Sequence, residues 1–495
     1  MADALITHVS QSDFLLGAVA LAAVVYYVYS VLSSPLAKVP GPWYSKFTEL
    51  VLRWHWLQGK RAKYVHSLHQ KYGPVVRVGP DEVDVTDLPS IKAIHTVKAT
   101  YIKSPKFYRA LSAPGVESVF STTDIQTHRR HRKLLSGGFS ESSLKSYLPI
   151  VEQRVNLAVE RIGQEMKSSR EAGDVFKWWL FMATDVIGEL TFGESFRMLE
   201  LGEKNDYSRN LEKIALVSAK RNTFPWLAKL ALKGIPIPGF ADNTDVIHKN
   251  AKYTTESLRR YQNLVEKNPE RPVPTLFTRI FKGQEEDTLT FKEIMDNATA
   301  YIVAGSDTTA VTLTYLVWRV LRDPEVRDKL VHEVQQLPED YSDHELQGLH
   351  YLNYTIEEAL RLHPAAPSAL PRIVPREGAD FAGSYLPGGS TVCTQAYSLH
   401  RDPSIFPDPE RFDPSRWAAP TKDMKDTMMP FGGGSRICIG IHLARLEMRL
   451  ATARFFRSFP NAKISTKEGM CDDDMEQVLF FLGPPKGRRC LVECS

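Results

Sequence analysis

The stretch FGGGSRICIG, from Phe431 to Gly440, carries the residue types with the most specific chemistry in this sequence. It places one cysteine, Cys438, two residues after Arg436 and among four glycines. The stretch holds no second cysteine and no histidine with which Cys438 could share a metal ion or a disulfide. Two interpretations are open: a thiolate that binds a metal, since thiolate is a soft anionic ligand, or a buried structural cysteine in a glycine-rich turn, the usual fate of a lone cysteine.

The first interpretation predicts haem iron, because one thiolate suits a metal that already holds four equatorial donors. Thiolate ligation pushes electron density onto iron and favours O–O cleavage. Glycine backbone N–H groups and the start of the predicted helix IHLARLEMRL would offset the thiolate charge. Glycines also allow a close approach to a flat macrocycle, and Arg436 could pair with a propionate.

A long helix is predicted from Phe291 to Arg322. Thr290 and Glu293 form a capping box before it, and about 33 helical residues span about 50 Å. Its middle, 304–309, exchanges bulky apolar residues for AGSDTT. Glycine weakens a helix interior, and a threonine hydroxyl can bond the carbonyl four residues earlier. The segment is either a tolerated kink or a local opening for a small ligand, to which Asp307 and Thr308 could hand protons.

Two further stretches bear on the architecture. Glu358 and Arg361 share one helix face, and the plain interpretation is a surface ion pair. The proline-rich segment FPDPERFDPSRW, 406–417, is irregular and must still be ordered. We expect the Arg411 side chain to complete a network with Glu358 and Arg361 that pins this segment.

Four motifs in this order resemble those of the cytochrome P-450 family of haem-thiolate monooxygenases. They are the cysteine loop at 431–440, the oxygen-activating helix motif at 304–309, Glu358-x-x-Arg361, and PERF at 409–412. The resemblance extends from the N-terminal apolar segment to the C-terminus, and the stretches RKLLSGGFS and DVIGELTFGESF resemble fungal members, which are often found in secondary-metabolite pathways.

The resemblance implies the family fold, mainly α with a minor β region, and a haem b cofactor. By this match Cys438 ligates the iron, while Arg436, Arg372, Arg132 and His128 meet the propionates. His128 departs from the pattern, because the family usually has tryptophan four residues before the arginine of that helix. Phe431 and Gly305 are expected to border the cofactor, and Asp307 and Thr308 to relay protons to dioxygen.

The apolar run Phe14–Leu32 has no charged residue and suits one crossing of a bilayer core. Lysine and arginine follow it rather than precede it, so the positive-inside bias puts the rest of the chain in the cytosol. A cleaved secretory peptide fits less well, because no basic region precedes the run. We expect a membrane anchor in residues 1–35 and a haem-binding monooxygenase domain in 36–495, at the endoplasmic reticulum.

Composition excludes other classes. The 495 residues carry a net charge of +4, too little to indicate nucleic-acid binding. Five scattered cysteines argue against a disulfide framework and for a reducing compartment. No dinucleotide fingerprint is present, so electrons must come from a partner, by resemblance NADPH–cytochrome reductase. Basic residues near the cysteine loop could dock it, or could be a solvated face: Arg129, Arg130, Lys133, Arg445 and Arg449.

The expected pocket walls are apolar, with aromatic patches, and predict a largely apolar small-molecule substrate. They comprise 107–120, Ala300, Ala304, 365–370 and 480–482. The segment 222–239 either dips into the bilayer beside the substrate entrance or is an ordinary packed loop. Hydroxylation or epoxidation of a terpenoid, polyketide or alkaloid is the expected activity. One alternative is a haem-thiolate isomerase or dehydratase that needs no external electrons, but the presence of Asp307 and Thr308 argues against it. The other alternative is a non-catalytic haem sensor or carrier.

Overall fold

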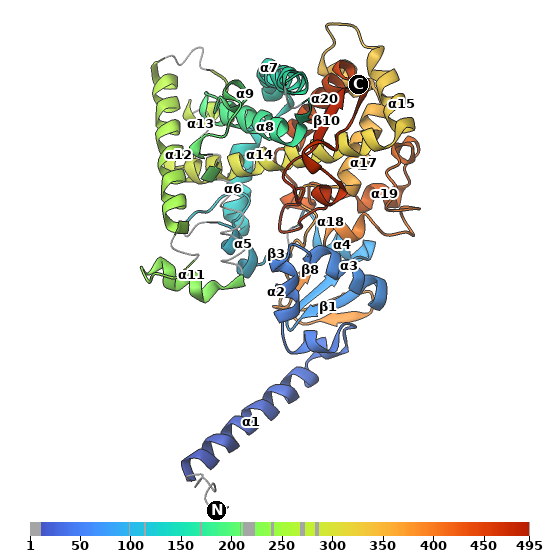
Figure 1. Cartoon of the computed structure of the whole chain (residues 1–495). Helices are drawn as coiled ribbons and strands as arrows, with labels where there is room; N and C mark the ends of the chain where they lie inside the picture. The colour runs from blue at the N-terminus through green and yellow to red at the C-terminus, as the bar shows by residue number, and fades with distance from the viewer. Residues whose placement is uncertain are drawn as a thin grey trace, which may run out of the picture.

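The N-terminal helix α1 (Gln11–Ser33) projects away from the rest of the chain (Figure 1). The structure is a computed structural model and describes residues 11–494 except 99, 113–114, 169–170, 208, 211–222, 239–241, 268–272 and 283–286. Within α1, Leu15–Ser33 has a mean hydropathy of 2.1 and none of it is buried against the body. The helix expected at the N-terminus is therefore present, and its length and composition are compatible with a membrane span.

Helix α14 (Phe291–Arg322) is the long helix predicted from the sequence, and it crosses the whole body (Figure 1). The predicted capping box is confirmed, because Thr290 and Glu293 bond each other's backbone N–H groups. The helix stops where Asp323 caps α15 (Pro324–Gln335), whose first residue is proline. This helix therefore begins and ends for reasons that are local in the sequence.

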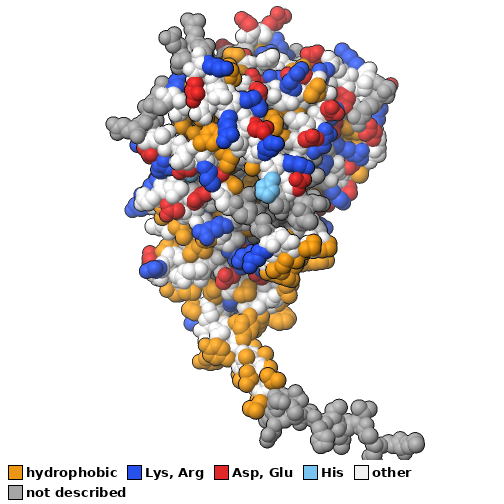
Figure 2. All heavy atoms as spheres, turned by 90° about the vertical axis from the view of Figure 1, so that its left-hand side faces the viewer, with side chains coloured by type: hydrophobic (Ala, Val, Ile, Leu, Met, Phe, Trp, Pro, Cys, Tyr) orange, Lys and Arg blue, Asp and Glu red, His pale blue; other side chains and the backbone are white. Residues whose placement is uncertain are grey.

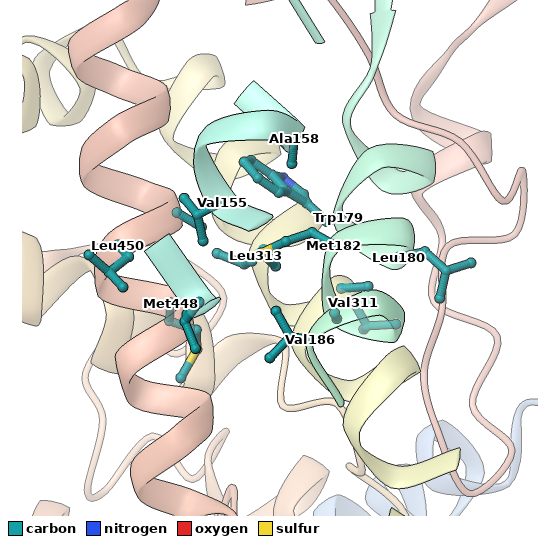
Figure 3. Close-up of a cluster of buried hydrophobic side chains, with 14 of the residues drawn as sticks. Val155, Ala158, Trp179, Leu180, Met182, Val186, Val311, Leu313, Met448 and Leu450 are labelled. Carbon is teal, nitrogen blue, oxygen red and sulfur yellow. The ribbon is translucent and has the colours of Figure 1, made fainter. Parts of the chain in front are cut away.

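Helix α14 is held by a core built from several helices. Figure 3 shows Val311 and Leu313 of α14 among side chains of α7 (Glu141–Met166), α8 (Val175–Phe192) and α20 (Ile441–Ser458). Trp179 and Met182 of α8 are fully buried there. Buried apolar area is the main favourable term in folding, so this core fixes α14 relative to α20, the helix that follows Cys438.

The remaining helices surround this core or lie toward the sheet. They are α2 (Leu50–Leu57), α3 (Arg61–Tyr72), α4 (Leu88–Ile94), α5 (Pro105–Leu111), α6 (Ile125–Ser136), α9 (Met198–Leu201), α11 (Pro225–Leu232), α12 (Asp242–Lys267), α13 (Thr278–Phe281), α16 (Asp343–Gly348), α17 (His350–Leu362), α18 (Ala396–Leu399) and α19 (Lys422–Thr427). A mainly helical fold with a minor β region, as predicted, is confirmed.

The strands form small sheets, and the largest has the order β1-β2-β8-β5-β3. Its members are β1 (Val75–Gly79), β2 (Glu82–Val85), β8 (Thr391–Cys393), β5 (Arg372–Ile373) and β3 (Ile102–Lys103). Strand β2 pairs with β8 in parallel, whereas the other pairs are antiparallel. The other sheets are β4 (Gly173–Asp174), β10 (Leu491–Cys494) and β9 (Ala462–Ile464), and the hairpin of β6 (Ala379–Phe381) and β7 (Ser384–Leu386).

Candidate functional site

The cysteine loop is a tight turn that needs its glycines. The Cys438 N–H donates to the Phe431 carbonyl oxygen at 2.9 Å and closes the loop. Gly432 and Gly434 have φ of 71° and 62°, in the left-handed region that favours glycine. A Cβ on Gly434 would lie 2.2 Å from the His95 carbonyl oxygen. The glycines therefore serve the turn and its close packing against His95.

The Cys438 sulfur combines accessibility with desolvated surroundings. The residue is exposed, yet burial by the surrounding chain raises the pKa of its thiol. The Gly440 backbone hydrogen bond and the Arg132 charge lower that pKa, but burial is the larger effect. An exposed residue whose thiol is nonetheless closely surrounded by protein is what the ligand of an enclosed cofactor would show. Arg132 Nη1 also donates to the Ile437 carbonyl oxygen at 2.6 Å, which ties α6 to the loop.

Five basic side chains gather at the edge of this site, and we call them the cationic cluster. Its members are Lys103, His128, Arg132, Arg372 and Arg436. Lys103, His128 and Arg372 are buried. Among the described residues, none of the five forms an ion pair with a carboxylate. Their contacts are instead to neutral oxygens: Arg436 Nη1 donates to the Thr122 carbonyl at 3.0 Å, and Arg372 Nη1 to the Tyr108 hydroxyl at 3.0 Å.

Mutual repulsion adds to the cost of placing positive charge on these buried side chains. Burial, followed by the charges of Arg372 and Arg436, holds the pKa of Lys103 well below its usual range. Burial and the neighbouring cations lower the pKa of His128 to about 3, and burial and Arg372 lower that of Arg436 to about 10. Buried charge is normally paired. A cluster of this composition fits a group that brings two carboxylates, as the propionates of haem do.

Lys103 is the member that sequence analysis missed. It lies on β3 and pairs directly with Arg372 of β5 in the sheet. Its ammonium group donates to the Phe120 carbonyl oxygen at 2.6 Å and lies over the rings of Tyr108 and Phe120. Because the pairing joins segments about 270 residues apart, no local pattern could have revealed it; its register is given by the structure alone.

One stripe of α14 is open although most of the helix is buried. Ala304 is exposed, and Ala300 and Thr308, one turn to either side, are half-buried. Thr308 Oγ1 donates to the Ala304 carbonyl at 2.7 Å, the back-bond expected from the sequence. Asp307 is half-buried next to Thr308. The stripe thus offers small residues and a hydroxyl to a space alongside the helix.

Gly305 has a packing role that differs from the expected one. A Cβ on Gly305 would lie 2.7 Å from Cγ1 of Ile187 on α8. The missing side chain therefore lets α14 approach α8 and does not itself create room for a ligand. Its contact with the cofactor, expected from the family resemblance, remains a prediction that involves only the backbone.

Glu447 on α20 is a second residue that sequence analysis missed. It is fully enclosed, and Thr309 Oγ1 of α14 donates to its Oε2 at 2.8 Å. Burial raises the pKa of this carboxyl to about 8 because desolvation penalises the charged form. The carboxyl is therefore largely protonated at neutral pH and joins the helix that bears Thr308 to the helix that follows Cys438.

The expected surface ion pair of Glu358 and Arg361 is wrong, because both side chains are fully buried. Arg361 binds the carboxylate with two hydrogen bonds, of 2.9 Å and 2.8 Å. It also donates to the carbonyl oxygens of His400, Pro409 and Arg411. A helix face that looks solvated in sequence is covered here by the irregular 406–417 segment.

The expected role of the Arg411 side chain is also corrected. Arg411 contributes only its backbone carbonyl, whereas Arg416 Nε and Trp417 Nε1 each donate to Glu358 at 2.9 Å. The 3-10 turn Pro414–Ala418 rotates these two side chains toward α17. The network that pins the segment therefore exists, but with Arg416 in the place expected for Arg411.

The expected pocket walls bring aromatic rings together. Phe120 lies 5.6 Å from Phe481 and 5.7 Å from Tyr108, and Phe107 lies 6.1 Å from Phe481, measured between ring centroids. Trp56 of α2 extends the cluster to Phe107 and Phe480. Lys103, between Tyr108 and Phe120, joins these rings to the cationic cluster.

A hollow on the outer side of the cysteine loop has a volume of about 430 Å³. Apolar and aromatic side chains line much of it, including Tyr354, Trp417, Phe431 and Ile441. Arg445, at its rim, forms an ion pair with Glu357. Arg449 pairs with Asp343 at 2.7 Å, and Arg130 pairs with Asp287 and Glu293. Three of the five basic residues proposed for docking are thus already engaged within the chain.

Together, the exposed Cys438 on a glycine loop, a buried cationic cluster and an open stripe on α14 fit a haem held through a thiolate. The sequence model of the family described as Cytochrome P450 matches residues 40–491. The chain therefore belongs to the cytochrome P450 family, whose members carry a haem.

Three fungal relatives share nearly the full length. "Cytochrome P450 monooxygenase tazI" of Aspergillus terreus is 50% identical over 96% of each chain. "Cytochrome P450 monooxygenase orf2" of Aspergillus niger is 43% identical over 97% of each chain. "Cytochrome P450 monooxygenase aflV" of Aspergillus parasiticus is 34% identical over 96% of this chain and 95% of its own.

Proposed function

We propose that the protein is a membrane-anchored monooxygenase that inserts one atom of dioxygen into a largely apolar small molecule. The second oxygen atom leaves as water, with two electrons supplied from NADPH through a separate reductase. The observation that carries the proposal is the accessible Cys438 sulfur on the loop that also presents Arg436 to the cationic cluster. The names of the relatives agree with this activity.

The cofactor in this proposal is haem b, held by residues of four segments. Cys438 Sγ would ligate the iron, and the cationic cluster would bind the propionates by charge-assisted hydrogen bonds. Phe431 and the Gly305 backbone would border the macrocycle. When bound, the haem supplies dioxygen activation, which thiolate ligation favours. The protein supplies binding, orientation and protons.

The proton-handling residues in this proposal lie on α14. The Thr308 hydroxyl donates its hydrogen bond to the Ala304 carbonyl, so its oxygen lone pairs can accept a hydrogen bond from a water molecule in the site. Asp307, the preceding residue, would exchange protons with solvent. The pair would deliver protons through water, and this role speaks against an isomerase or dehydratase that needs no external electrons.

Electron delivery in this proposal uses NADPH–cytochrome reductase at the face that carries the cysteine loop. Arg129 and Lys133 of α6 are exposed and make no ion pair with any described residue, so they are better suited to meet an acidic partner than the paired Arg130, Arg445 and Arg449. The alternative for these charges is a solvated helix face.

Membrane association at the endoplasmic reticulum, with residues 1–35 as the anchor and 36–495 as the cytosolic haem domain, completes the proposal. Figure 2 shows hydrophobic side chains over α1 and over the end of the body from which α1 leaves. Exposed apolar residues of α2 and α11 contribute there: Leu50, Trp54, Leu57 and Trp226. Arg53 Nη1 donates to the Thr223 carbonyl at 2.8 Å and holds α2 beside the segment that leads into α11. This arrangement favours contact of α11 with the bilayer over an ordinary packed loop.

The substrate class follows from the aromatic walls and the fungal relatives. We place the reaction in secondary metabolism, as hydroxylation or epoxidation of a terpenoid, polyketide or alkaloid. Comparison of metabolites from strains with and without the gene would identify the substrate that accumulates. The full-length protein, reconstituted in vesicles with reductase and NADPH, should then oxidise that substrate. Turnover without NADPH would favour an isomerase or dehydratase, and haem binding without any turnover would favour a sensor.

A further inference from the structure

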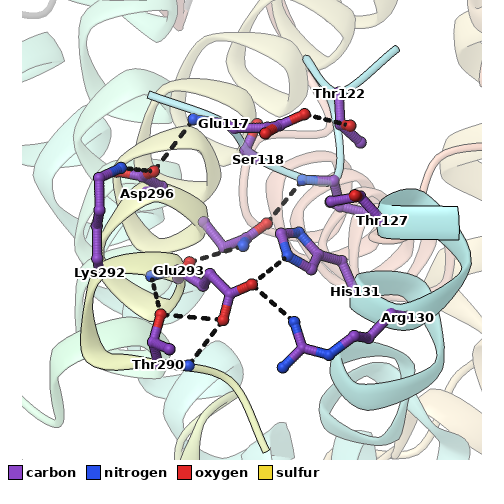
Figure 4. A network of polar contacts seen from close by, with 12 residues as sticks. Glu117, Ser118, Thr122, Thr127, Arg130, His131, Thr290, Lys292, Glu293 and Asp296 are labelled. Carbon is purple, nitrogen blue, oxygen red and sulfur yellow. Dashed lines mark hydrogen bonds and ion pairs between the residues drawn. The ribbon is translucent and has the colours of Figure 1, made fainter. Parts of the chain in front are cut away.

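The loop 115–122, between α5 and α6, is held by side chains from the first turns of α14 (Figure 4). Lys292 Nζ donates to the Gly115 carbonyl at 2.7 Å. The Glu117 N–H donates to Asp296 Oδ2 at 3.1 Å, and the Val119 N–H donates to Asn297 Oδ1 at 2.8 Å. These contacts involve the loop backbone, so they fix its path whatever side chains it carries.

The two central side chains of this contact are committed to it. Asn297 is fully buried, and its Nδ2 donates to the Glu293 carbonyl at 2.7 Å, which orients the amide so that Oδ1 points at the loop. Asp296 is buried as well, and Lys292 Nζ donates to its Oδ2 at 2.6 Å. Buried polar groups that lose a partner pay the desolvation cost of the group left behind. Removing either side chain should therefore free the loop rather than leave it in place.

The opposite side of the loop forms the edge of the haem site. The Phe120 carbonyl accepts the Lys103 bond and the Thr122 carbonyl accepts the Arg436 bond, so two members of the cationic cluster are bonded to it. The Phe120 ring is partly exposed and contacts the rings of Tyr108 and Phe481. A shift of the loop would move this ring and two of the cations together.

We infer that Asn297 and Asp296 are positioning residues that act through the 115–122 loop to set the place of the Phe120 ring, and thereby select ligands by their apolar bulk. The inference rests on the proposed function, because it assumes that haem lies beside the cationic cluster. On this inference, a ligand with an aromatic body contacts the Phe120 ring, whereas a small ligand on the iron does not. Asn297 and Asp296 therefore affect the second kind of ligand and leave the first unchanged.

The test compares two probes that bind haem iron through the same imidazole nitrogen. Imidazole measures access to the iron alone, and 4-phenylimidazole adds an aromatic body to the same ligand. The affinity of the full-length holoprotein for each probe is measured from the shift of the haem absorption spectrum on binding. Asn297→Ala should lower the affinity for 4-phenylimidazole by about fivefold, the equivalent of about 1 kcal/mol. The same variant should lower the affinity for imidazole by less than about twofold. Asp296→Ala should act in the same direction, whereas Asp296→Asn, which keeps an acceptor for the Glu117 N–H, should remain close to the parent protein.

Asn353→Ala is the matched control, because the Asn353 amide likewise donates to backbone carbonyls, of Leu346 and Leu349, and among the described residues it makes no hydrogen bond to the 115–122 loop or to the cationic cluster. It should lower thermal stability without changing the ratio of the two affinities. An unchanged ratio in Asn297→Ala, or an equal loss for both probes, would overturn the inference. If that variant does not fold, Lys292→Met decides in its place, since Lys292 is largely exposed and its loss should move the ratio in the same direction by about twofold.

The ferrous carbon-monoxide spectrum separates this inference from the proposed function. A parent protein without the thiolate-type spectrum refutes the haem-thiolate assignment itself. A normal spectrum in every variant, with an unchanged affinity ratio, refutes only the role of Asn297 and Asp296.

Discussion

Thr309 of α14 donates a hydrogen bond of 2.8 Å to the buried carboxyl of Glu447 on α20. The two residues lie in helices that flank the proposed haem site on its two sides, since α14 bears Thr308 and α20 follows Cys438. A charged carboxylate at this place would be poorly solvated, so burial raises the pKa of Glu447 to about 8. The bond therefore joins the helices through a carboxyl that is neutral over most of the physiological pH range.

Glu447 should make the protein less stable as pH rises. Between the ordinary carboxyl pKa of 4.5 and the folded value of about 8, the folded state keeps a proton that the unfolded state has lost. The free energy of unfolding therefore falls through this window, by at most about 1.36 kcal/mol per pH unit. Below the window the contribution is complete, and above it the contribution is lost.

Thermal unfolding of the parent and Glu447→Gln proteins from pH 5 to pH 9 would measure this effect. The glutamine keeps an acceptor for Thr309 and cannot titrate, so its stability should decline less over the window. Other titrating groups are common to both proteins and cancel in the difference. Parallel pH profiles for the two proteins would show that Glu447 is ionised in the folded state.

Thr308→Ala should leave haem binding intact and divert electrons from product to hydrogen peroxide. The hydroxyl lies on the open stripe of α14, and proton delivery by a placed side chain typically accelerates a step by about 10²–10⁴-fold. We expect product formed per NADPH consumed to fall by about tenfold or more, with peroxide rising to match. The ferrous carbon-monoxide spectrum should not change.

Thr314→Ala is the control for this substitution. Thr314 donates to the Ala310 carbonyl at 2.7 Å, the same back-bond on the same helix, but it is fully buried away from the open stripe. Its loss should lower stability and leave the coupling of NADPH to product unchanged. Equal coupling in Thr308→Ala and the parent would remove Thr308 from the proton path.

The sequence predicted the features that depend only on residues close to one another in the chain. The capping box of α14, the apolar α1 and the glycine-rich cysteine loop all depend on residues within a few positions of one another. Gly305 was recognised as unusual, but its reason, contact with Ile187 of α8, depends on a packing partner more than 100 residues away. A local sequence pattern shows that a residue is unusual for its position in a helix, but it does not show which structural or functional role the residue has.

Contacts between distant segments could not be predicted. Lys103 joins the cationic cluster because β3 pairs with β5, and Glu447 becomes neutral because the folded chain buries it. Arg411 and Arg416 are equally basic and lie in one irregular segment, so choosing between them required the path of the 3-10 turn at 414–418. Burial of the ion pair between Glu358 and Arg361 was missed for the same reason.

Arg416→Ala should destabilise the protein more than Arg411→Ala. Arg416 donates to the buried Glu358 carboxylate, and removing one partner of a buried charge network costs about 3–5 kcal/mol; the remaining bonds from Arg361 and Trp417 will reduce that cost. Arg411 uses its backbone carbonyl, which alanine retains. Unfolding by denaturant should give a lower midpoint concentration for Arg416→Ala than for Arg411→Ala. The reverse order would show that the Arg411 side chain contributes to the network after all.

Lys103→Met should accelerate haem loss. Lys103 is buried with its ammonium group over the rings of Tyr108 and Phe120, and methionine keeps an apolar side chain of similar length while removing the charge that we assign to a propionate. Transfer of haem to excess apomyoglobin should be faster by about tenfold, the equivalent of about 1.4 kcal/mol. Lys92→Met, which removes an exposed lysine paired with Asp426 on the surface, is the control and should not change the rate. If Lys103 serves only packing, methionine should replace it without faster haem loss. An unchanged transfer rate would therefore exclude Lys103 from propionate binding. It would leave the assignment of Cys438 as the iron ligand intact.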